Sequence, residues 1–144
     1  MALVERAAGR SVAQVLEDRT REHPDRVFLV FGDRRFTYRQ VNTRADAIAA
    51  ALHELGIERG DRIALDLPNW PEFVITMFAA AKLGAVIVPL NPRYTVPELQ
   101  YMLRHSEASV VVCAENFGGI DYLQLFESFL TSLPELQYVV TVGE

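Results

Sequence analysis

The stretch from residue 69 to residue 94 constrains the fold most, because its hydrophobic periodicity changes at Gly84. Before Gly84 the apolar residues recur at helical spacing, and Pro71 stands where the first turn of a helix tolerates proline. The predicted inward face comprises Phe73, Val74, Met77, Phe78 and Ala81. After Gly84, residues 85–89 form a continuous apolar run, typical of a strand covered on both faces. The stretch therefore predicts a helix that leads into a buried parallel strand.

The apolar run 73–90 also has nearly the length of a membrane span and holds a single charge, Lys82. A spanning helix keeps one period throughout, whereas this run changes from helical to strand-like spacing. We therefore expect no membrane span. Lys82 lies near the end of the predicted helix, where a cation interacts favourably with the helix dipole.

Three capping-box patterns predict where further helices begin, because each Ser or Thr satisfies free amides of a first turn. The boxes are Ser11 with Gln14, Thr37 with Gln40, and Thr95 with Glu98. They predict helices over 12–22, over 38–55 and from residue 96, and apolar spacing predicts one more over 123–133. The residues expected on the buried faces are Val41, Ala45, Ile48, Ala49, Leu52, Leu55, Leu99, Met102, Leu103, Leu123, Phe126, Leu130 and Leu133.

Short apolar runs bounded by turn residues predict the strands. The predicted strands are 27–31, 35–37, 62–67, 85–89, 109–113 and 138–142. The first two flank a turn at residues 32–34 and indicate an antiparallel hairpin, while residues 116–121 indicate a loop that contains glycine. From residue 62 onward the order is β-α-β-α-β-α-β, which predicts an α/β fold with a parallel sheet of four strands and helices on both faces.

The predicted edge strand 138–142 is apolar, and no element that would cover it follows. An exposed apolar edge is a liability in a complete domain. We therefore expect this chain to be part of a larger domain. In such sheets the ligand crevice lies beyond the carboxyl ends of the strands.

Five short motifs follow one another along the chain: Phe-Thr-Tyr at 36–38, Leu-Gly-Ile with Gly-Asp-Arg-Ile across 55–63, Asn-Trp-Pro-Glu-Phe at 69–73, Lys-Leu-Gly-Ala at 82–85, and Pro-Leu-Asn-Pro at 89–92. In this order and spacing, the series resembles the N-terminal part of the AMP-forming acyl-CoA synthetases and related acid-adenylating ligases, the ANL superfamily. The resemblance covers residues 25–142. It implies that residues 1–144 are the N-terminal portion of the large N-terminal domain, without the rest of that domain and without the C-terminal domain.

The resemblance implies that the full-length protein is an enzyme that uses ATP, Mg²⁺ and CoA. It would activate a fatty or other apolar carboxylic acid to its acyl-adenylate and transfer the acyl group to CoA. The family's phosphate-binding loop, its magnesium-binding glutamate and its catalytic lysine come later in sequence, so we expect no catalytic residue here and an inactive fragment. The glycine pair Gly118-Gly119 is followed by Ile120-Asp121 and lacks the lysine of a phosphate-binding loop.

One segment carries a site prediction: Asn91, Pro92, Arg93 and Tyr94. In acyl-CoA-forming relatives the loop after this strand lies near the path of the CoA thiol arm, so the resemblance implies a channel wall. The alternative is a plain strand-to-helix loop in which Asn91 caps and Tyr94 packs. Some relatives carry arginines near residues 117–122, and this chain has none there.

Other polar residues give weaker indications. Asp66, near the end of a predicted strand, is either functional or hydrogen-bonded to a loop amide. His23, His53 and His105 fall on separate helices or helix ends without partners at ligand spacing, so we predict no metal site. Cys113 follows three valines and is interpreted as a buried strand residue.

Charge and cysteine content limit the partners and the compartment. A net charge of −5 with scattered basic residues argues against nucleic-acid binding. A single cysteine allows no internal disulfide, and Glu5, Arg6 and Arg10 interrupt any apolar leader, so the expected compartment is the cytoplasm.

The expected partners are a small carboxylic acid, ATP and CoA, and a homodimer stays open. The alternative function is a free-standing flavodoxin-like module that binds a nucleotide or a partner without catalysis.

Overall fold

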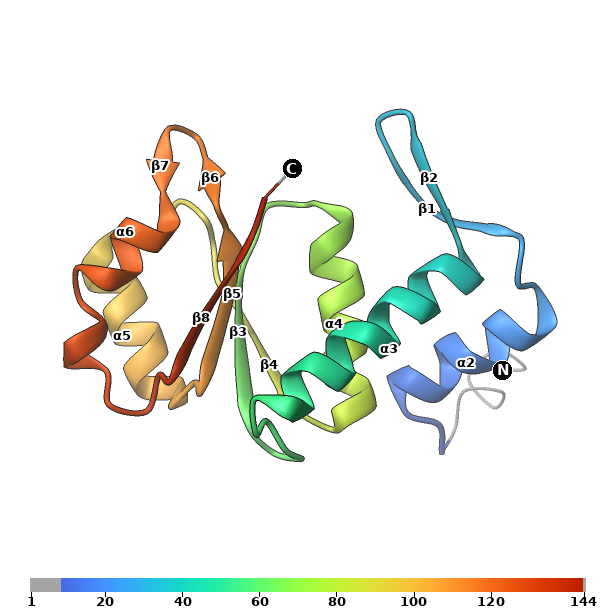
Figure 1. Ribbon diagram of the computed structural model, residues 1–144, viewed down its shortest axis with the longest axis horizontal. Helices are drawn as coiled ribbons and strands as arrows, with labels where there is room; N and C mark the ends of the chain where they lie inside the picture. The colour runs from blue at the N-terminus through green and yellow to red at the C-terminus, as the bar shows by residue number, and fades with distance from the viewer. Residues whose placement is uncertain (1–8, 144) are drawn as a thin grey trace.

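A four-stranded parallel sheet forms the centre of the computed structural model, which describes residues 9–143 (Figure 1). In spatial order its strands are β4 (Val86–Pro89), β3 (Arg62–Asp66), β5 (Val110–Ala114) and β8 (Tyr138–Val142). The predicted parallel sheet is confirmed, and the structure adds the strand order. Glu5 and Arg6, on which the expectation about a leader rests, lie outside the described residues.

Helices cover both faces of the sheet, as predicted. Figure 1 shows α5 and α6 on one side, with α4 and α3 on the other and α2 beyond them. The helical segments are α2 (Val12–Glu22), α3 (Tyr38–Glu54), α4 (Pro71–Leu83), α5 (Val96–Ser106), α6 (Tyr122–Glu127) and the 3₁₀ turn η1 (Leu130–Ser132). The predicted antiparallel hairpin is also present, as β1 (Val27–Phe31) and β2 (Arg34–Thr37). Within residues 9–143, no helix is long and apolar enough to cross a membrane.

The three capping boxes start the helices where the sequence predicts. The amide of Gln14 donates to Ser11 Oγ at 3.2 Å, and the amide of Gln40 donates to Thr37 Oγ1 at 3.3 Å. At the third box, the amide of Thr95 donates to a Glu98 carboxylate oxygen at 2.7 Å. These contacts are local, so the sequence alone can specify them.

Helix α4 buries a different face from the predicted one. Its buried residues are Pro71, Ile75, Thr76, Phe78, Ala79 and Ala80. Of the residues predicted on its inward face, Phe78 is buried. The others, Phe73, Val74, Met77 and Ala81, are only partly buried. The reason is that α4 lies between two hydrophobic cores: Ala80 belongs to the core under the sheet, and Ile75 and Ala79 belong to the core shared with α2 and α3. Periodicity toward a single face cannot describe a helix that is covered on two sides.

Strand β4 lies at the edge of the sheet and is only partly buried, which differs from the buried strand that the sequence predicts. Its only neighbour in the four-stranded sheet is β3, and Val86 is 49% exposed. Pro89 pairs with Leu65 in this ladder. Proline has no amide hydrogen to donate and is confined to positions such as a sheet edge, which suits this placement.

The region after β5 also differs from its prediction. Residues 116–121 form a short hairpin, β6 (Asn116–Phe117) and β7 (Ile120–Asp121), with Gly118 and Gly119 at positive φ in its turn. Helix α6 then ends at Glu127, and Leu123 is 42% exposed instead of inward. Asp121 caps α6, which turns Tyr122 and Phe126 toward the core. Leu55, predicted to be inward on α3, also lies at the surface.

Lys82 joins three helices. Its ammonium group lies 2.9 Å from Glu17 on α2 and 2.8 Å from Asp46 on α3, while Lys82 itself is in the last turn of α4. The side chain is only 10% exposed. The predicted place near the helix end is confirmed, but the ion pairs come from distant parts of the chain and were not predicted. These pairs outweigh partial burial and raise the pKa of Lys82.

Candidate functional site

The carboxyl ends of the strands open toward a single face of the molecule. The loop after β3 leads to α4 on one side of the sheet, whereas the loops after β4 and β5 lead to α5 and α6 on the other. Neighbouring loops therefore diverge next to β3. In open α/β sheets this divergence is the switch point at which ligands bind.

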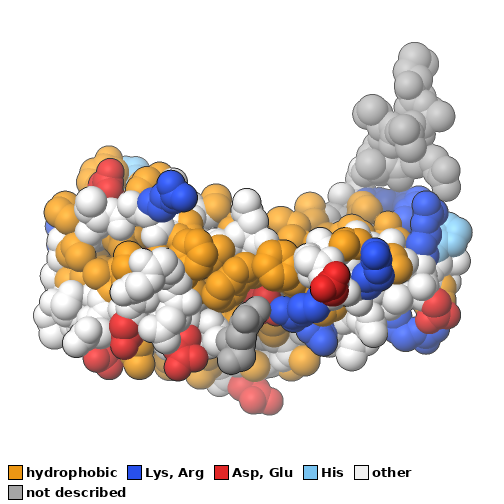
Figure 2. All heavy atoms as spheres, turned by 90° about the horizontal axis from the view of Figure 1, so that it is seen from above, with side chains coloured by type: hydrophobic (Ala, Val, Ile, Leu, Met, Phe, Trp, Pro, Cys, Tyr) orange, Lys and Arg blue, Asp and Glu red, His pale blue; other side chains and the backbone are white. Residues whose placement is uncertain are grey.

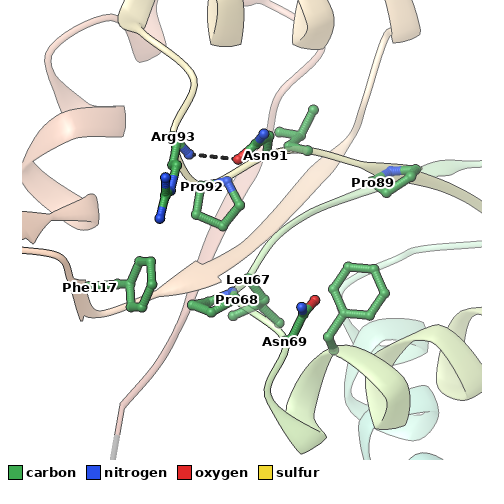
Figure 3. A pocket seen from close by; sticks show the side chains of 10 residues that line it. Leu67, Pro68, Asn69, Pro89, Asn91, Pro92, Arg93 and Phe117 are labelled. Atoms are coloured by element: carbon green, nitrogen blue, oxygen red, sulfur yellow. Dashed lines mark hydrogen bonds between the residues drawn. The ribbon is translucent and has the colours of Figure 1, made fainter.

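A cavity of about 390 Å³ lies at this switch point (Figure 3). It is lined by Leu67, Pro68, Asn69, Phe73, Pro89, Leu90, Asn91, Pro92, Arg93 and Phe117. Figure 3 shows the loop after β4 facing the loop after β3, with Phe117 at one end. Figure 2 looks down on this end of the molecule and shows hydrophobic side chains across the middle of the face.

Three of the four residues predicted as a site line this cavity together. Asn91, Pro92 and Arg93 lie on its wall, while Tyr94 lines a neighbouring groove beside α5. The cavity wall is mainly apolar, and its polar side chains are Asn69, Asn91 and Arg93. An apolar wall with a few polar groups is typical of a ligand site.

The loop that carries these residues is also held by local hydrogen bonds, as an ordinary strand-to-helix turn would be. The side-chain oxygen of Asn91 accepts from the Arg93 amide at 3.0 Å, and the Asn91 carbonyl accepts from the Tyr94 amide at 2.8 Å. Tyr94 packs against the main core. Capping by Asn91 and packing by Tyr94 are therefore present, as the structural alternative predicts. Arg93 is exposed, and among residues 9–143 its guanidinium has no ion-pair or hydrogen-bond partner.

Tyr122, at the start of α6, ties this loop to that helix, and no sequence pattern marks this residue in advance. Its hydroxyl donates to the carbonyl of Pro92 at 2.6 Å, across thirty positions of sequence. The side chain is fully buried. Burial, with the charges of Asp66 and Cys113, raises the pKa of Tyr122, so the group stays a neutral donor. The only local signal is its place directly after the cap Asp121.

Asp66 ends β3, one residue before Leu67 of the cavity wall, and is completely buried. Neither of its carboxyl oxygens has a hydrogen-bond partner within the described part of the chain. The prediction of a hydrogen bond to a loop amide is therefore wrong. Burial without a partner disfavours the charged form and raises the pKa of Asp66 from 3.8 to about 6.

Cys113 is a buried strand residue, as predicted, and it is paired with Asp66 across the β3–β5 ladder. Its thiol donates to the carbonyl of Val140 at 3.7 Å. Burial and the nearby charge of Asp66 raise the pKa of Cys113 to about 12.

Other candidates are not gathered into the cavity. His53 lies on α3, His105 stacks on Tyr101 of α5, and His23 caps α2. In the described part of the chain, no group of three or more His, Cys, Asp or Glu side chains could hold a metal ion. Gly118 and Gly119 serve the turn of the β6–β7 hairpin.

Comparison with known proteins places this geometry in a wider context. Residues 16–142 match the family described as AMP-binding enzyme. The chain is 34% identical over 137 residues to 2,3-dihydroxybenzoate-AMP ligase of Bacillus subtilis (strain 168), covering 95% of this chain and 25% of that protein. It is 35% identical over 141 residues to crotonobetaine/carnitine–CoA ligase of Salmonella paratyphi A (strain ATCC 9150 / SARB42), covering 94% and 26%.

Among solved structures, the anthranilate CoA ligase AuaEII in complex with anthranoyl-AMP has a TM-score of 0.84 and 30% sequence identity. The similarity covers 92% of this chain and 25% of that chain. The present chain thus spans about a quarter of the length of the relatives it matches. The shared part is the N-terminal subdomain, with its parallel sheet and flanking helices.

Proposed function

Because this chain belongs to the AMP-binding enzyme family of adenylate-forming ligases, we propose that it is the N-terminal portion of the large domain of an acid–thiol ligase. The support is the match over residues 16–142 together with the shared subdomain fold. The rest of that domain and the C-terminal domain would lie outside residues 1–144. The proposed compartment is the cytoplasm, because the single thiol, Cys113, is free and buried.

The proposed reaction has two steps. The substrate carboxylate attacks the α-phosphorus of ATP and displaces pyrophosphate, which gives an acyl-adenylate. The CoA thiol then attacks the acyl carbon and displaces AMP, which gives the thioester. Residues 9–143 hold no group of three or more His, Cys, Asp or Glu side chains, so we assign magnesium to none of these residues.

The proposed substrate is a fatty or other apolar carboxylic acid. Relatives named for 2,3-dihydroxybenzoate and anthranilate make aryl acids a second class to screen beside it. The alternative acceptor is a carrier protein, whose phosphopantetheine thiol has the same reactive end as CoA.

Within this chain, we assign the loop of Asn91, Pro92, Arg93 and Tyr94 to the path of the CoA thiol arm. One observation carries the assignment: the guanidinium of Arg93, exposed and without a partner among residues 9–143, stands at the rim of a mainly apolar cavity. CoA carries its thiol at one end of a long arm and its phosphates at the other. A guanidinium at the rim could hold those phosphates, because arginine binds phosphate in a bidentate manner. The apolar residues below it would line the arm.

The test is Arg93→Ala in the native gene product, whose length is first determined by intact mass. Loss of a charge-assisted hydrogen bond of about 1.5–3 kcal/mol should raise the KM for CoA by roughly tenfold or more. The exchange of pyrophosphate into ATP, which reports acyl-adenylate formation, should stay unchanged. Arg21→Ala, at an exposed ion pair on α2, is the matched control.

Two outcomes would contradict the proposal. An unchanged KM for CoA and for a carrier protein would contradict the assignment of this loop to the path of the thiol arm. A native product that binds nucleotide but catalyses no exchange with any acid would favour the binding module without catalysis.

A further inference from the structure

Lys82 is the only lysine in the sequence, which contains thirteen arginines. An arginine side chain stays protonated in proteins, whereas a lysine amine becomes a nucleophile once it loses its proton. Lys82 is therefore the one side-chain amine in residues 1–144 that an activated acyl group can modify. It lies outside the cavity, and the proposed reaction does not use it.

Two carboxylates from different helices hold the Lys82 ammonium at the junction of α2, α3 and α4 (Figure 1). Glu17 of α2 lies 2.9 Å from it, and Asp46 of α3 lies 2.8 Å from it. Burial disfavours the charged form, but the hydrogen bonds and charges of Asp46 and Glu17 outweigh it and raise the pKa of Lys82. The amine is thus kept both protonated and covered.

We propose that Lys82 is a conditional acylation site: acyl phosphates and acyl-adenylates reach its amine only when α2 and α3 come away from α4, and acylation then weakens the junction of the three helices. The donor class is the mixed anhydride of a carboxylic acid and a phosphoric acid. The acyl-adenylate of the proposed reaction belongs to this class. The inference concerns Lys82 alone and holds for any donor of the class, whether or not this protein makes it.

The chemical step is acyl transfer to nitrogen. The neutral amine attacks the acyl carbon and forms a C–N bond, while the C–O bond to the phosphate breaks. Phosphate or AMP leaves with the electron pair, and the nitrogen gives a proton to water, so nothing is oxidised or reduced. An ammonium group has no free electron pair. The step therefore cannot begin while Glu17 and Asp46 keep the proton on Lys82.

Acylation changes what the side chain can bind. The product is a neutral amide with a single N–H, so it cannot replace the two ion pairs of the ammonium group. Glu17 and Asp46 lose their shared cation. The acyl group must also fit where the lysine side chain is only 10% exposed. Both effects oppose the return of α2 and α3 to their places against α4.

The test treats the native gene product with acetyl phosphate, a small donor of this class, and follows the Lys82 peptide by mass spectrometry. In buffer, Lys82 should be acetylated far more slowly than in urea. The double variant Glu17→Gln with Asp46→Asn should react about tenfold faster in buffer for each unit by which the pKa of the amine falls. The matched control is Asp18→Asn with Asp25→Asn, at acids paired with arginines, and it should react as the unmodified protein does.

The two single variants, Glu17→Gln and Asp46→Asn, show whether release of the amine or general unfolding causes the faster reaction. Each retains one ion pair with Lys82 and should react at an intermediate rate. Circular dichroism at the assay temperature confirms that each variant is folded. Single variants that are folded and react no faster than the unmodified protein would overturn the proposal.

Lys82→Gln provides a second readout, because glutamine resembles the neutral acylated side chain. In hydrogen exchange, the amides of α2 and α3 should exchange about five- to thirtyfold faster than in the unmodified protein. Arg21→Gln removes an exposed pair on α2 alone and should leave their exchange unchanged. Unchanged exchange in Lys82→Gln would contradict the weakened junction. Acetylation of Lys82 in buffer at the rate seen in urea would contradict its protection.

Discussion

Asp66 and Cys113 face each other across the β3–β5 ladder, each completely buried, and neither hydrogen-bonds the other. A buried carboxylate beside a thiol, without a hydrogen-bond partner among residues 9–143, is a costly arrangement in a protein interior. The consequences can be measured at both residues.

Asp66→Asn should stabilise the chain at neutral pH. Burial raises the folded pKa to about 6, above the ordinary 3.8, so the folded state holds the proton more tightly than the unfolded state. The penalty is absent below about pH 4, grows as the pH rises through the folded pKa, and is complete above it. A shift of this size corresponds to at most about 3 kcal/mol at pH 7.5. Urea unfolding of both chains at pH 4 and pH 7.5 measures the difference.

The control for this stability experiment is Asp33→Asn, at an exposed turn residue between β1 and β2. It should change the free energy of unfolding by less than about 0.5 kcal/mol. An equal gain from Asp66→Asn at both pH values would show that ionisation of Asp66 is not the cause.

Cys113 should be inert toward thiol reagents in the folded chain. Its pKa is raised to about 12 by burial first and by the Asp66 charge second, so almost no thiolate exists at pH 8. We expect an Ellman reagent to label the chain rapidly in urea and only at the rate of unfolding in buffer. Since burial is the larger cause, Asp66→Asn should leave the thiol inert. Labelling of the folded chain at the rate seen in urea would contradict this.

Lys82→Met should destabilise the packing of three helices. The ammonium group bridges Glu17 and Asp46, and the lysine is largely covered although both acids are half-exposed. Water screens such pairs in part, so we expect a loss of about 1–2 kcal/mol in urea unfolding. Arg21→Met, which removes an exposed pair with Asp18 on α2 alone, should cost less than about 0.5 kcal/mol. Equal losses in the two variants would refute a bridging role.

The edge strand β8 should promote self-association of the isolated chain. It pairs only with β5 in the four-stranded sheet, and it carries no charged residue and no proline. Thr141→Lys places a charge on its exposed residue and should lower the weight-average mass in sedimentation at high concentration. Thr131→Lys, in the exposed 3₁₀ turn η1, adds the same charge away from the edge and should change nothing. An unmodified chain that stays monomeric at all concentrations would contradict self-association through β8.

Local features of the fold were predictable because their causes lie within a few residues. Ser11, Thr37 and Thr95 each cap a helix through a partner three positions away. Gly84 ends α4 at a φ of 72°, which glycine adopts without strain. The alternation of helices and strands then limits the sheet to a parallel one.

Long-range features were not predictable in the same way. The hydrogen bond from Tyr122 to Pro92 depends on how α6 packs over the sheet, and the missing partner of Asp66 depends on what β5 places opposite it. The site prediction found the loop because that loop follows a strand. It missed Tyr122 because nothing in a tyrosine at the start of a helix reveals which carbonyl it will reach.

Helix α4 contributes side chains to both hydrophobic cores, and this has a consequence for how the chain unfolds. Ile75 and Ala79 belong to the core with α2 and α3, and Ala80 belongs to the core beneath the sheet. Neither core can open without exposing apolar surface of the same helix. The N-terminal helices and the sheet should therefore behave as one cooperative unit, and amide hydrogens on both sides of α4 should exchange through a common opening event.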